Sequence, residues 1–276
     1  MARVYGRIAR FFGMTRALFE IITAARFDEV VVETPLPSRE GRTAPLPDDH
    51  HHILVERLEK SGVQSLWVHQ REAWDVAGRG EHFIVTTGTA SGKSMCFNLP
   101  VVDGLLRRPH ARALYLYPTK ALAQDQVRRL QDLSVGIVPC AVYDGDTPSE
   151  ARRVARAQAR ALLTNPDMIS MAMLPHHERW GDFFLNLDYV VIDEAHAYRG
   201  VFGSHVGNVL RRLRRVAWFY GAEPQFLLAS ATISNALDHA RELTGLEMTL
   251  IDNDGAPLGR RRMAVSYTHL RAHETP

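Results

Sequence analysis

The stretch from Phe83 to Ser94, FIVTTGTASGKS, constrains the fold more than any other part of the chain. Its opening is an apolar, β-branched run typical of a strand, and small residues then lead to Gly92-Lys93-Ser94, where a helical pattern begins. A phosphate chain needs these parts in this order, because the strand fixes a loop whose backbone N–H groups surround oxygens at a helix N-terminus. The stretch therefore predicts a phosphate-binding loop between a strand and a helix.

The residues of this loop have distinct chemical roles. We expect Lys93 to reach the β- and γ-phosphates of a nucleotide and the Ser94 hydroxyl to bind Mg²⁺. The strict pattern has Gly where this chain has Thr87, a departure that is not typical of small-molecule kinases. A GKS triplet also occurs by chance, but the strand before it and the helix after it favour the phosphate-binding interpretation. The predicted nucleotide-binding residues are Gln70, Thr87, Gly88, Thr89, Ala90, Ser91, Gly92, Lys93 and Ser94.

Gln70 belongs to this set because of its place before the loop, in the run Leu66–Ala73 that follows a helical pattern at Ile53–Lys60. A side-chain amide can donate to adenine N7 and accept from the exocyclic amine, so Gln70 can distinguish adenine from guanine. A Gln on a helix is otherwise an ordinary exposed residue. Its position ahead of the loop favours the base-reading interpretation.

Strand and helix patterns alternate after the loop. We expect strands at 113–117, 138–143, 161–163 and 189–192, and helices at 95–106, 121–130 and 149–160. This repetition predicts an α/β fold whose mainly parallel sheet has helices on both faces. Function in such sheets collects at the carboxyl ends of the strands.

Two acids end the apolar run Tyr189–Ile192, which lacks alternation, as a central parallel strand should. Carboxylates at the edge of a buried strand are costly unless something pairs with them. We expect Asp193 to hold Mg²⁺ opposite Ser94, and Glu194 to orient and deprotonate an attacking water. The alternative is that two acidic residues stand at the end of this strand by chance and have no function. The predicted catalytic residues are Lys93, Asp193, Glu194 and His196, and the predicted metal ligands are Ser94 and Asp193.

Another apolar run, Gln225–Thr232, ends in small and hydroxylated residues. We expect Ser230 and Thr232 to hydrogen-bond to His196 and Asp193, and so to relay the state of the γ-phosphate to the rest of the protein. The loop with Lys93 and the acids at Asp193 are expected to end on neighbouring strands and to share one magnesium–triphosphate.

The composition limits the other possibilities. With 276 residues, 46% of them hydrophobic, the chain can hold one large domain or two small ones. A net charge of +2 means that nucleic-acid binding must use a local basic face. Cys96 and Cys140 have no CxxC partner, which favours a reducing, cytoplasmic setting. No apolar run approaches the length of a membrane span, so we expect no membrane partner.

In order, the chain carries HQ, TGTASGKS, PTKALAQDQ, TNPD, DEAH and SAT. This series resembles the first RecA-like domain of the DEAD/DEAH-box helicases of superfamily 2, over about 53–232, and we expect the domain to continue to 264. The wording of YPTKALAQDQ, YDGDTP and HAYRGVFGSHVGNVLRRLRR is most similar to the mitomycin-repair-factor (YprA-like) DNA helicases. The resemblance implies a RecA-like P-loop NTPase domain that uses ATP and Mg²⁺ and moves along single-stranded DNA.

The resemblance also implies a track for the strand backbone, where hydroxyls, loop N–H groups and one lysine suit phosphate contacts. The residues of this predicted track are Pro118, Thr119, Lys120, Gly145, Thr164, Asn165, Pro166 and Asp167. The run Arg211–Arg215 can add to this track or form a solvated helix face. An RNA helicase remains an alternative, because no residue of the track reads the 2′-hydroxyl decisively. A non-translocating ATP-binding switch module and a metabolic kinase are further alternatives that these motifs disfavour.

Three segments are expected along the chain: an N-terminal extension at 1–50, the RecA-like domain at 51–264, and a tail at 265–276. The tail resembles a translated sequencing adapter, so we expect it to be non-native and to lack native contacts; a natural disordered terminus is the alternative. Related ATPases complete their site with arginines from a second RecA-like domain, which this fragment is expected to lack. An arginine finger is worth about 10³–10⁵ in rate, so we expect slow hydrolysis by the fragment alone.

Overall fold

The computed structural model describes residues 30–36, 38–88, 90–259 and 261–266. It forms two compact units. The larger unit is Gly41–Ala256, and the smaller consists of the described parts of 1–40 and 257–276. Within the described residues, no helix combines the length and the apolar character needed to cross a lipid bilayer.

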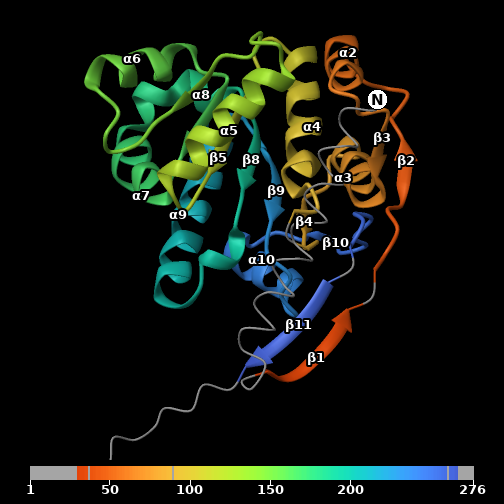
Figure 1. The fold of residues 1–276 in the computed structure, drawn as a ribbon. Coiled ribbons are helices and arrows are strands. Elements are labelled where there is room, and N and C mark those ends of the chain that lie inside the picture. Colours follow the sequence, from red (N-terminus) through yellow and green to blue (C-terminus); the bar gives the residue numbers. More distant parts are fainter. Residues whose placement is uncertain (1–29, 37, 89, 260, 267–276) are drawn as a thin grey trace, which may run out of the picture. The chain divides into compact units, whose positions relative to one another are not determined.

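A seven-stranded parallel sheet organises the larger unit (Figure 1). The strands in spatial order are β10 (Thr249–Ile251), β4 (Phe83–Val85), β9 (Gln225–Ala229), β8 (Leu187–Ile192), β5 (Arg112–Leu116), β7 (Ala161–Thr164) and β6 (Cys140–Val142). Every neighbouring pair is parallel. The expected α/β fold with a parallel sheet is therefore confirmed.

Helices cover both faces of this sheet. One face packs against α2 (His52–Lys60), α3 (Val68–Gly78), α4 (Lys93–Arg107) and α5 (Lys120–Leu133). The other packs against α6 (Ser149–Gln158), α8 (Gly181–Leu185), α9 (Gly200–Phe219) and α10 (Ala236–Thr244). The short α7 (Pro166–Met168) leads into a π-helical turn at Ile169–Met173 and a 3₁₀ segment at Leu174–Trp180, and another 3₁₀ turn spans Ala195–Ala197.

The strands read as continuous apolar runs because both of their faces are buried. In β4, Phe83 and Val85 pack into one core with Phe97 of α4, whereas Ile84 packs into the other core with Leu210 of α9. All five of these side chains are at most 1% exposed. Burial of such a side chain contributes about 1.5–3 kcal/mol each, so the two cores fix the strand ends that carry the polar residues.

The order of the strands differs from expectation at one point. The Lys93 loop follows β4 and the acids follow β8, and we expected these strands to be neighbours. That expectation was wrong, because β9 lies between them and is paired with both. Since neighbouring strands lie about 4.8 Å apart, the ends of β4 and β8 are separated by about 10 Å at the same edge of the sheet.

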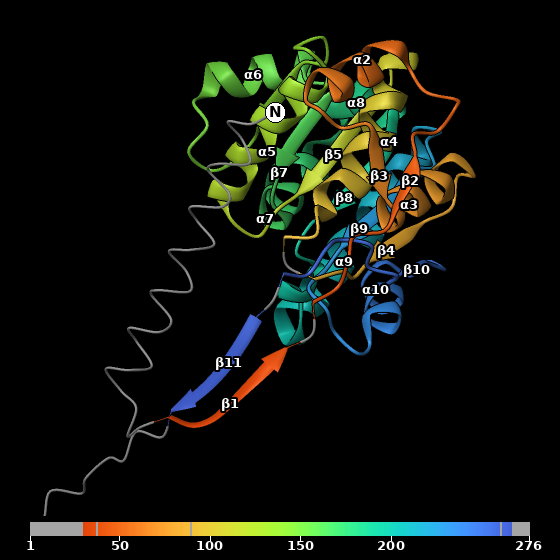
Figure 2. The ribbon, with the colours of Figure 1, turned by 45° about the vertical axis from the view of Figure 1, so that its right-hand side comes forward.

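An antiparallel pair of short strands begins the larger unit. β2 (Thr43–Pro45) pairs with β3 (Ser65–Trp67), and β3 leads directly into α3 (Figure 2). The Arg42 guanidinium donates to the Asn253 side chain at 2.6 Å and to the backbone oxygen of Asp254 at 3.2 Å. These contacts place the start of the unit at Gly41, before the predicted domain start at residue 51.

The smaller unit contains one antiparallel pair of strands, β1 (Val30–Leu36) and β11 (Arg261–Ser266). Val265 pairs with Val32, and Ser266 with Val30. Val265 and Ser266, the first two residues of the predicted tail at 265–276, thus take part in this pairing. The rest of that tail, and residues 1–29 of the predicted N-terminal extension, lie outside the described residues. The adapter origin of the tail stays a prediction.

Candidate functional site

The predicted phosphate-binding loop joins β4 to α4, with Thr89 outside the described residues. Two of its residues have left-handed backbone, Ala90 with φ 63° and Gly92 with φ 83°. The Thr87 and Ser91 hydroxyls lie 2.6 Å apart and share a hydrogen bond. Gly92 is the N-cap of the 15-residue helix α4, so the loop leads into a helix N-terminus, which favours an anion.

Lys93 is the first residue of α4, and its ammonium group turns back over this loop. Its Nζ donates to the backbone oxygens of Thr87 and Gly88, each at 2.9 Å. An ammonium group has three donors on a flexible stem, so it can exchange these carbonyls for phosphate oxygens. The position of Lys93 supports its expected phosphate contact.

Gln70 braces the loop from α3. Its Oε1 accepts from the backbone N–H of Trp67 at 3.0 Å, and its Nε2 donates to the backbone oxygen of Gly92 at 3.2 Å. Gln70 is only 7% exposed, and a Cβ atom at Gly92 would lie 2.6 Å from its Nε2. Both ends of the amide therefore contact backbone here, whereas the sequence predicts that they contact adenine.

Sequence reasoning assigned no role to His69, which is fully buried beside the loop. The backbone N–H of Gly255 donates to its Nδ1 at 3.1 Å, and its Nε2 lies 3.2 Å from the backbone oxygen of Ser91. Because Nδ1 accepts, the neutral ring carries its proton on Nε2 and donates it to Ser91. His69 therefore joins the phosphate loop to the segment around residue 255.

Asp254 was also missed. Its Oδ2 accepts from the backbone N–H of Gly88 at 3.2 Å, and its Oδ1 accepts from the N–H of Ala256 at 2.9 Å. A carboxylate thus contacts an N–H of the phosphate-binding loop. No pattern in the sequence indicates this contact, because 166 positions separate the two residues.

The acids follow β8 as predicted. Asp193 Oδ1 accepts from the backbone N–H of Glu194 at 2.9 Å, and Glu194 itself has left-handed backbone with φ 51°. Burial raises the pKa of Asp193 to about 6; the Glu194 charge acts in the same direction, whereas that hydrogen bond and the charges of Lys93 and Arg129 oppose it. Lys93 and Asp193 therefore lie within electrostatic reach of each other, and a half-buried carboxylate of this kind favours a cation as partner.

The link between the acidic loop and the end of β9 joins the His196 side chain to a backbone N–H. His196 Nδ1 accepts from the N–H of Ala231 at 3.1 Å and lies 3.3 Å from Glu194 Oε2. The expected side-chain bonds are absent from the described residues: the buried Ser230 hydroxyl has no hydrogen-bond partner, and Thr232 is exposed. The coupling role of Ser230 and Thr232 stays a prediction, with Ala231 as the residue that makes the contact.

Arg129 of α5 contacts the predicted metal ligand Ser94. Its Nη1 donates to Ser94 Oγ at 3.2 Å, and its Nη2 donates to Asp125 at 3.0 Å. Arg129 lies nine residues beyond Lys120 on an exposed helix face, so its sequence position carries no signal of this contact. The predicted site therefore combines a lysine and backbone N–H groups, which donate hydrogen bonds, with a hydroxyl and a carboxylate, which can ligate a metal ion. These groups fit a nucleoside triphosphate with Mg²⁺, which takes one or two protein ligands beside phosphate oxygens.

Seven of the eight residues of the predicted nucleic-acid track line one cleft of about 160 Å³. They are Pro118, Thr119, Lys120, Thr164, Asn165, Pro166 and Asp167, which lie at or just beyond the carboxyl ends of β5 and β7. Gly145 is exposed next to the lining residue Asp144. Phe202, an aromatic residue at the start of α9 that sequence reasoning did not assign, also lines this cleft and is 45% exposed.

The track residues differ in what they can offer a ligand. The Thr164 hydroxyl is buried and donates to the backbone oxygen of Tyr143 at 2.6 Å, and the Asn165 side chain caps α7 by accepting from Met168 N–H at 2.9 Å. Lys120 pairs with Asp146 at the surface. Thr119 is the exposed N-cap of α5 without a side-chain capping bond. The Thr119 hydroxyl, Lys120 and the N-terminus of α5 are therefore the groups that suit a phosphate.

Comparison with known proteins supports one family. Residues 67–240 match the family model described as DEAD/DEAH box helicase. The chain is 44% identical over 250 residues to the uncharacterized ATP-dependent helicase YprA of Bacillus subtilis, covering 89% of this chain and 33% of YprA. It is 41% identical over 235 residues to the ATP-dependent helicase HRQ1 of Saccharomyces cerevisiae, covering 82% of this chain and 22% of HRQ1.

Solved structures agree with this result. The crystal structure of the helicase MrfA bound to DNA matches with a TM-score of 0.85 and 43% identity, over 90% of this chain and 36% of that chain. The RNA-bound DEAD-box helicase Mss116 matches with a TM-score of 0.62 at 18% identity, over 76% of this chain and 46% of that chain, which shows the shared fold alone. The chain thus spans about a third or less of the length of YprA and HRQ1.

Proposed function

Because this chain belongs to the DEAD/DEAH box helicase family, we propose that it is the ATP-binding motor domain of a helicase that moves along single-stranded DNA. DNA is favoured over RNA because the DNA-bound MrfA structure is 43% identical, whereas the RNA-bound Mss116 structure is 18% identical. This chain covers 33% of YprA, so we infer the activity of a whole helicase from its relatives.

One observation carries the ATP-dependent part of the proposal. The Lys93 loop and the acids of Asp193–Glu194 lie at the same edge of the sheet, at the ends of β4 and β8, with only β9 between them. The resulting separation of about 10 Å is comparable to the length of a triphosphate with its metal. No rearrangement of the sheet is needed for both groups to contact one nucleotide.

Each side chain then has a specific task. Lys93 binds phosphate oxygens, the backbone N–H groups before α4 surround the phosphates, and Ser94 with Asp193 holds Mg²⁺, which when bound neutralises phosphate charge. Glu194 orients the attacking water and accepts its proton. Arg129 donates to Ser94 Oγ at 3.2 Å, so its guanidinium would stand beside a metal ion held by this oxygen.

The cleft of the predicted track supports the nucleic-acid part. Lys120 and the start of α5 offer a charge and N–H groups that contact phosphates without reading sequence. The cleft is small, about 160 Å³, which suits a backbone segment better than a whole base stack. Contacts of this kind position a strand for a motor that moves irrespective of sequence.

Nucleotide binding by this chain is the first test. We expect a fluorescent ATP analogue to bind in the presence of Mg²⁺ and Lys93→Ala to abolish this binding, because the variant removes the ammonium held over the loop. Lys60→Ala is the matched control, since Lys60 is exposed on α2 and pairs with Glu56. Equal binding by both variants would contradict the proposed site.

Steady-state hydrolysis tests the motor. By itself this chain is expected to turn over ATP slowly, because the arginines of a second RecA-like domain contribute about 10³–10⁵ in rate. In a protein extended to the length of its relatives, we expect single-stranded DNA to raise the ATPase rate more than single-stranded RNA does. A rate that neither polymer changes would support an ATP-binding switch module instead.

A further inference from the structure

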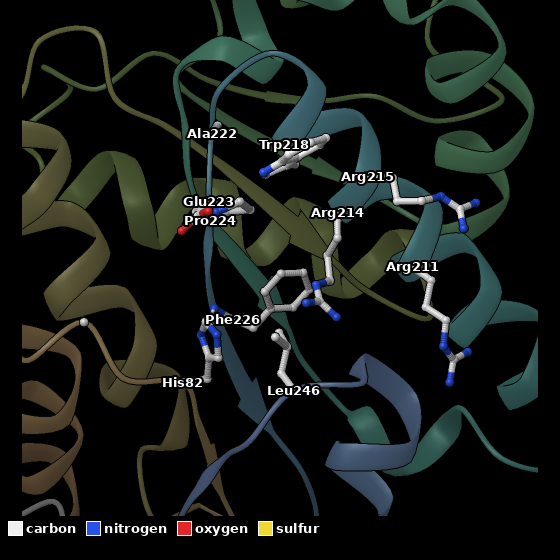
Figure 3. A pocket seen from close by; sticks show the side chains of 11 residues that line it. His82, Arg211, Arg214, Arg215, Trp218, Ala222, Glu223, Pro224, Phe226 and Leu246 are labelled. Atoms are coloured by element: carbon white, nitrogen blue, oxygen red, sulfur yellow. Dashed lines mark hydrogen bonds between the residues drawn. The ribbon is translucent and has the colours of Figure 1, made fainter.

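A row of cationic and aromatic side chains runs along one face of α9. Arg211, Arg214, Arg215 and Trp218 are related by steps of three or four residues, so they share one side of the helix. They line a cleft of about 660 Å³ together with the loop before β9 (Figure 3). We call this site the arginine–tryptophan cleft.

This cleft lies at the amino ends of the strands, whereas the predicted ATP site lies at their carboxyl ends. Its lining residues His82 and Pro224 immediately precede β4 and β9, whereas the phosphate-binding loop and Ser230 follow those strands. The arginine run therefore does not extend the predicted strand-backbone track at the carboxyl ends of β5 and β7. A ligand in this cleft would be a separate contact.

The arginines of the cleft have no carboxylate partner among the described residues. Arg211 donates to the backbone oxygen of Glu242 at 3.0 Å, and Arg214 donates to those of Thr244 and Gly245 at 3.0 and 3.2 Å. These bonds fix the two side chains on the C-terminal end of α10 and leave most of their five N–H donors unused. Arg215 is exposed and makes no ion pair within the described part of the chain.

The walls of the cleft suit a flat, partly apolar ligand. Trp218 exposes 71% of its surface, and Phe226 and Leu246 form an apolar floor beside Arg214. His82 accepts from the backbone N–H of Phe226 at 3.1 Å through Nδ1, so its neutral ring carries the proton on Nε2. Burial lowers the pKa of His82, and the charge of Arg214 adds to this effect, which favours the neutral ring.

An exposed indole beside unpaired guanidinium groups matches the chemistry of one polymer. We propose that the arginine–tryptophan cleft binds a segment of single-stranded nucleic acid, with a base stacked on Trp218 and a phosphate bound by Arg214 and Arg215. Stacking tolerates any base, and guanidinium groups form paired hydrogen bonds with phosphate. The lining acid Glu223 stands at the end of the loop before β9, so the phosphate is expected on the α9 side. An acidic protein segment would satisfy the arginines but leave the indole face unused.

Binding of a labelled oligothymidylate to the full chain, without ATP, tests this inference independently of the motor. Trp218→Ala is expected to weaken binding roughly 5- to 150-fold, the effect of losing one stacked base. Arg215→Glu is expected to weaken binding and to flatten its salt dependence by about one phosphate contact. Neither side chain is buried, so both variants should keep the wild-type melting temperature.

Arg212→Glu is the matched control, because Arg212 is exposed on the same helix but lies outside the cleft lining. The proposal requires Arg212→Glu to bind close to wild type. It is overturned if Arg212→Glu and Arg215→Glu weaken binding equally. It is also overturned if every variant binds oligothymidylate as tightly as the wild type does. It is also overturned if polyglutamate binds in an Arg215-dependent manner while oligothymidylate does not, which would assign the cleft to a protein partner.

Discussion

At the scale of single residues, the nucleotide site depends on close contacts between backbone and side chain. Gly92 has left-handed backbone with φ 83°, and the space beside its Cα is filled by the Gln70 amide. Only a residue without Cβ fits both conditions at no cost. The loop before α4 therefore keeps its shape through Gly92 and Gln70 together.

Gly92→Ala is expected to weaken ATP binding as well as stability. The left-handed backbone costs about 1–2 kcal/mol for alanine, and the new Cβ, 2.6 Å from Gln70 Nε2, displaces that amide. Gly62→Ala is the matched control, because Gly62 has a similar φ of 82° with nothing within 4 Å. Denaturant unfolding should show a loss of stability for Gly62→Ala and a larger loss for Gly92→Ala, because only the latter disturbs the Gln70 hydrogen bonds. If Gly62→Ala weakened ATP binding equally, the contact with Gln70 would not matter.

The residues that local patterns place at the predicted site stand at strand ends and at the start of a helix. Lys93 and Asp193 belong to this class, because a strand end and a helix start can be read from local patterns. Asp254 and Arg129 were missed because their contacts join segments 166 and 35 positions apart. Thr164 lines the cleft together with other residues of the predicted track, but its hydroxyl bonds to Tyr143, which no local pattern indicates.

At the scale of elements, α4 is the helix that connects the phosphate loop to the core. Its residue Gly104 faces β8, where the Tyr189 hydroxyl accepts from Arg108 Nη2 at 2.8 Å. A Cβ at Gly104 would lie 2.2 Å from that hydroxyl and 2.9 Å from two ring carbons. The missing side chain at Gly104 thus sets how closely α4 approaches the strand of the acids.

Gly104→Ala is expected to destabilise the protein by about 1–3 kcal/mol, because the added methyl group overpacks the contact between α4 and β8. Gly78→Ala, at the end of α3, meets nothing within 4 Å and should be neutral or slightly stabilising, since alanine favours helix. Urea unfolding of both variants measures the difference. A loss of similar size in the two would mean that the Tyr189 contact adapts without cost.

The existence of most elements follows from the sequence, whereas their order in space does not. The apolar runs at 83–87, 113–117 and 189–192 correspond to β4, β5 and β8. The place of β9 between β4 and β8 was not predicted, because strand pairing depends on contacts between distant segments. The strand β10 at the sheet edge was missed for a similar reason, since three residues are too few for a clear pattern.

At the scale of the whole molecule, all seven strands of the parallel sheet belong to Gly41–Ala256. The sequence predicted a domain at 51–264 instead. The difference arises from β2 and from Arg42, which contact β3 and the segment around Asp254. These contacts join residues more than 20 positions apart, so composition alone does not indicate them.

A protein limited to 41–256 is expected to melt close to the temperature of the full chain and to bind ATP. One limited to 51–264 should melt lower, because it loses the β2–β3 pairing and the Arg42 contacts; each kcal/mol lost corresponds to about 2–4 °C at this size. Differential scanning calorimetry of the two proteins decides between the boundaries. A higher melting temperature for 51–264 would favour the boundary predicted from the sequence.

The position of β9 has a consequence for how this site can evolve. Main-chain hydrogen bonds on both sides of β9 fix the interval between the lysine loop and the acids. Substitutions in the lysine loop or in the acidic loop can therefore change the chemistry of that loop without changing the distance between the two loops. An insertion at the end of β9, by contrast, would shift the lysine loop and the acids relative to each other in a single event.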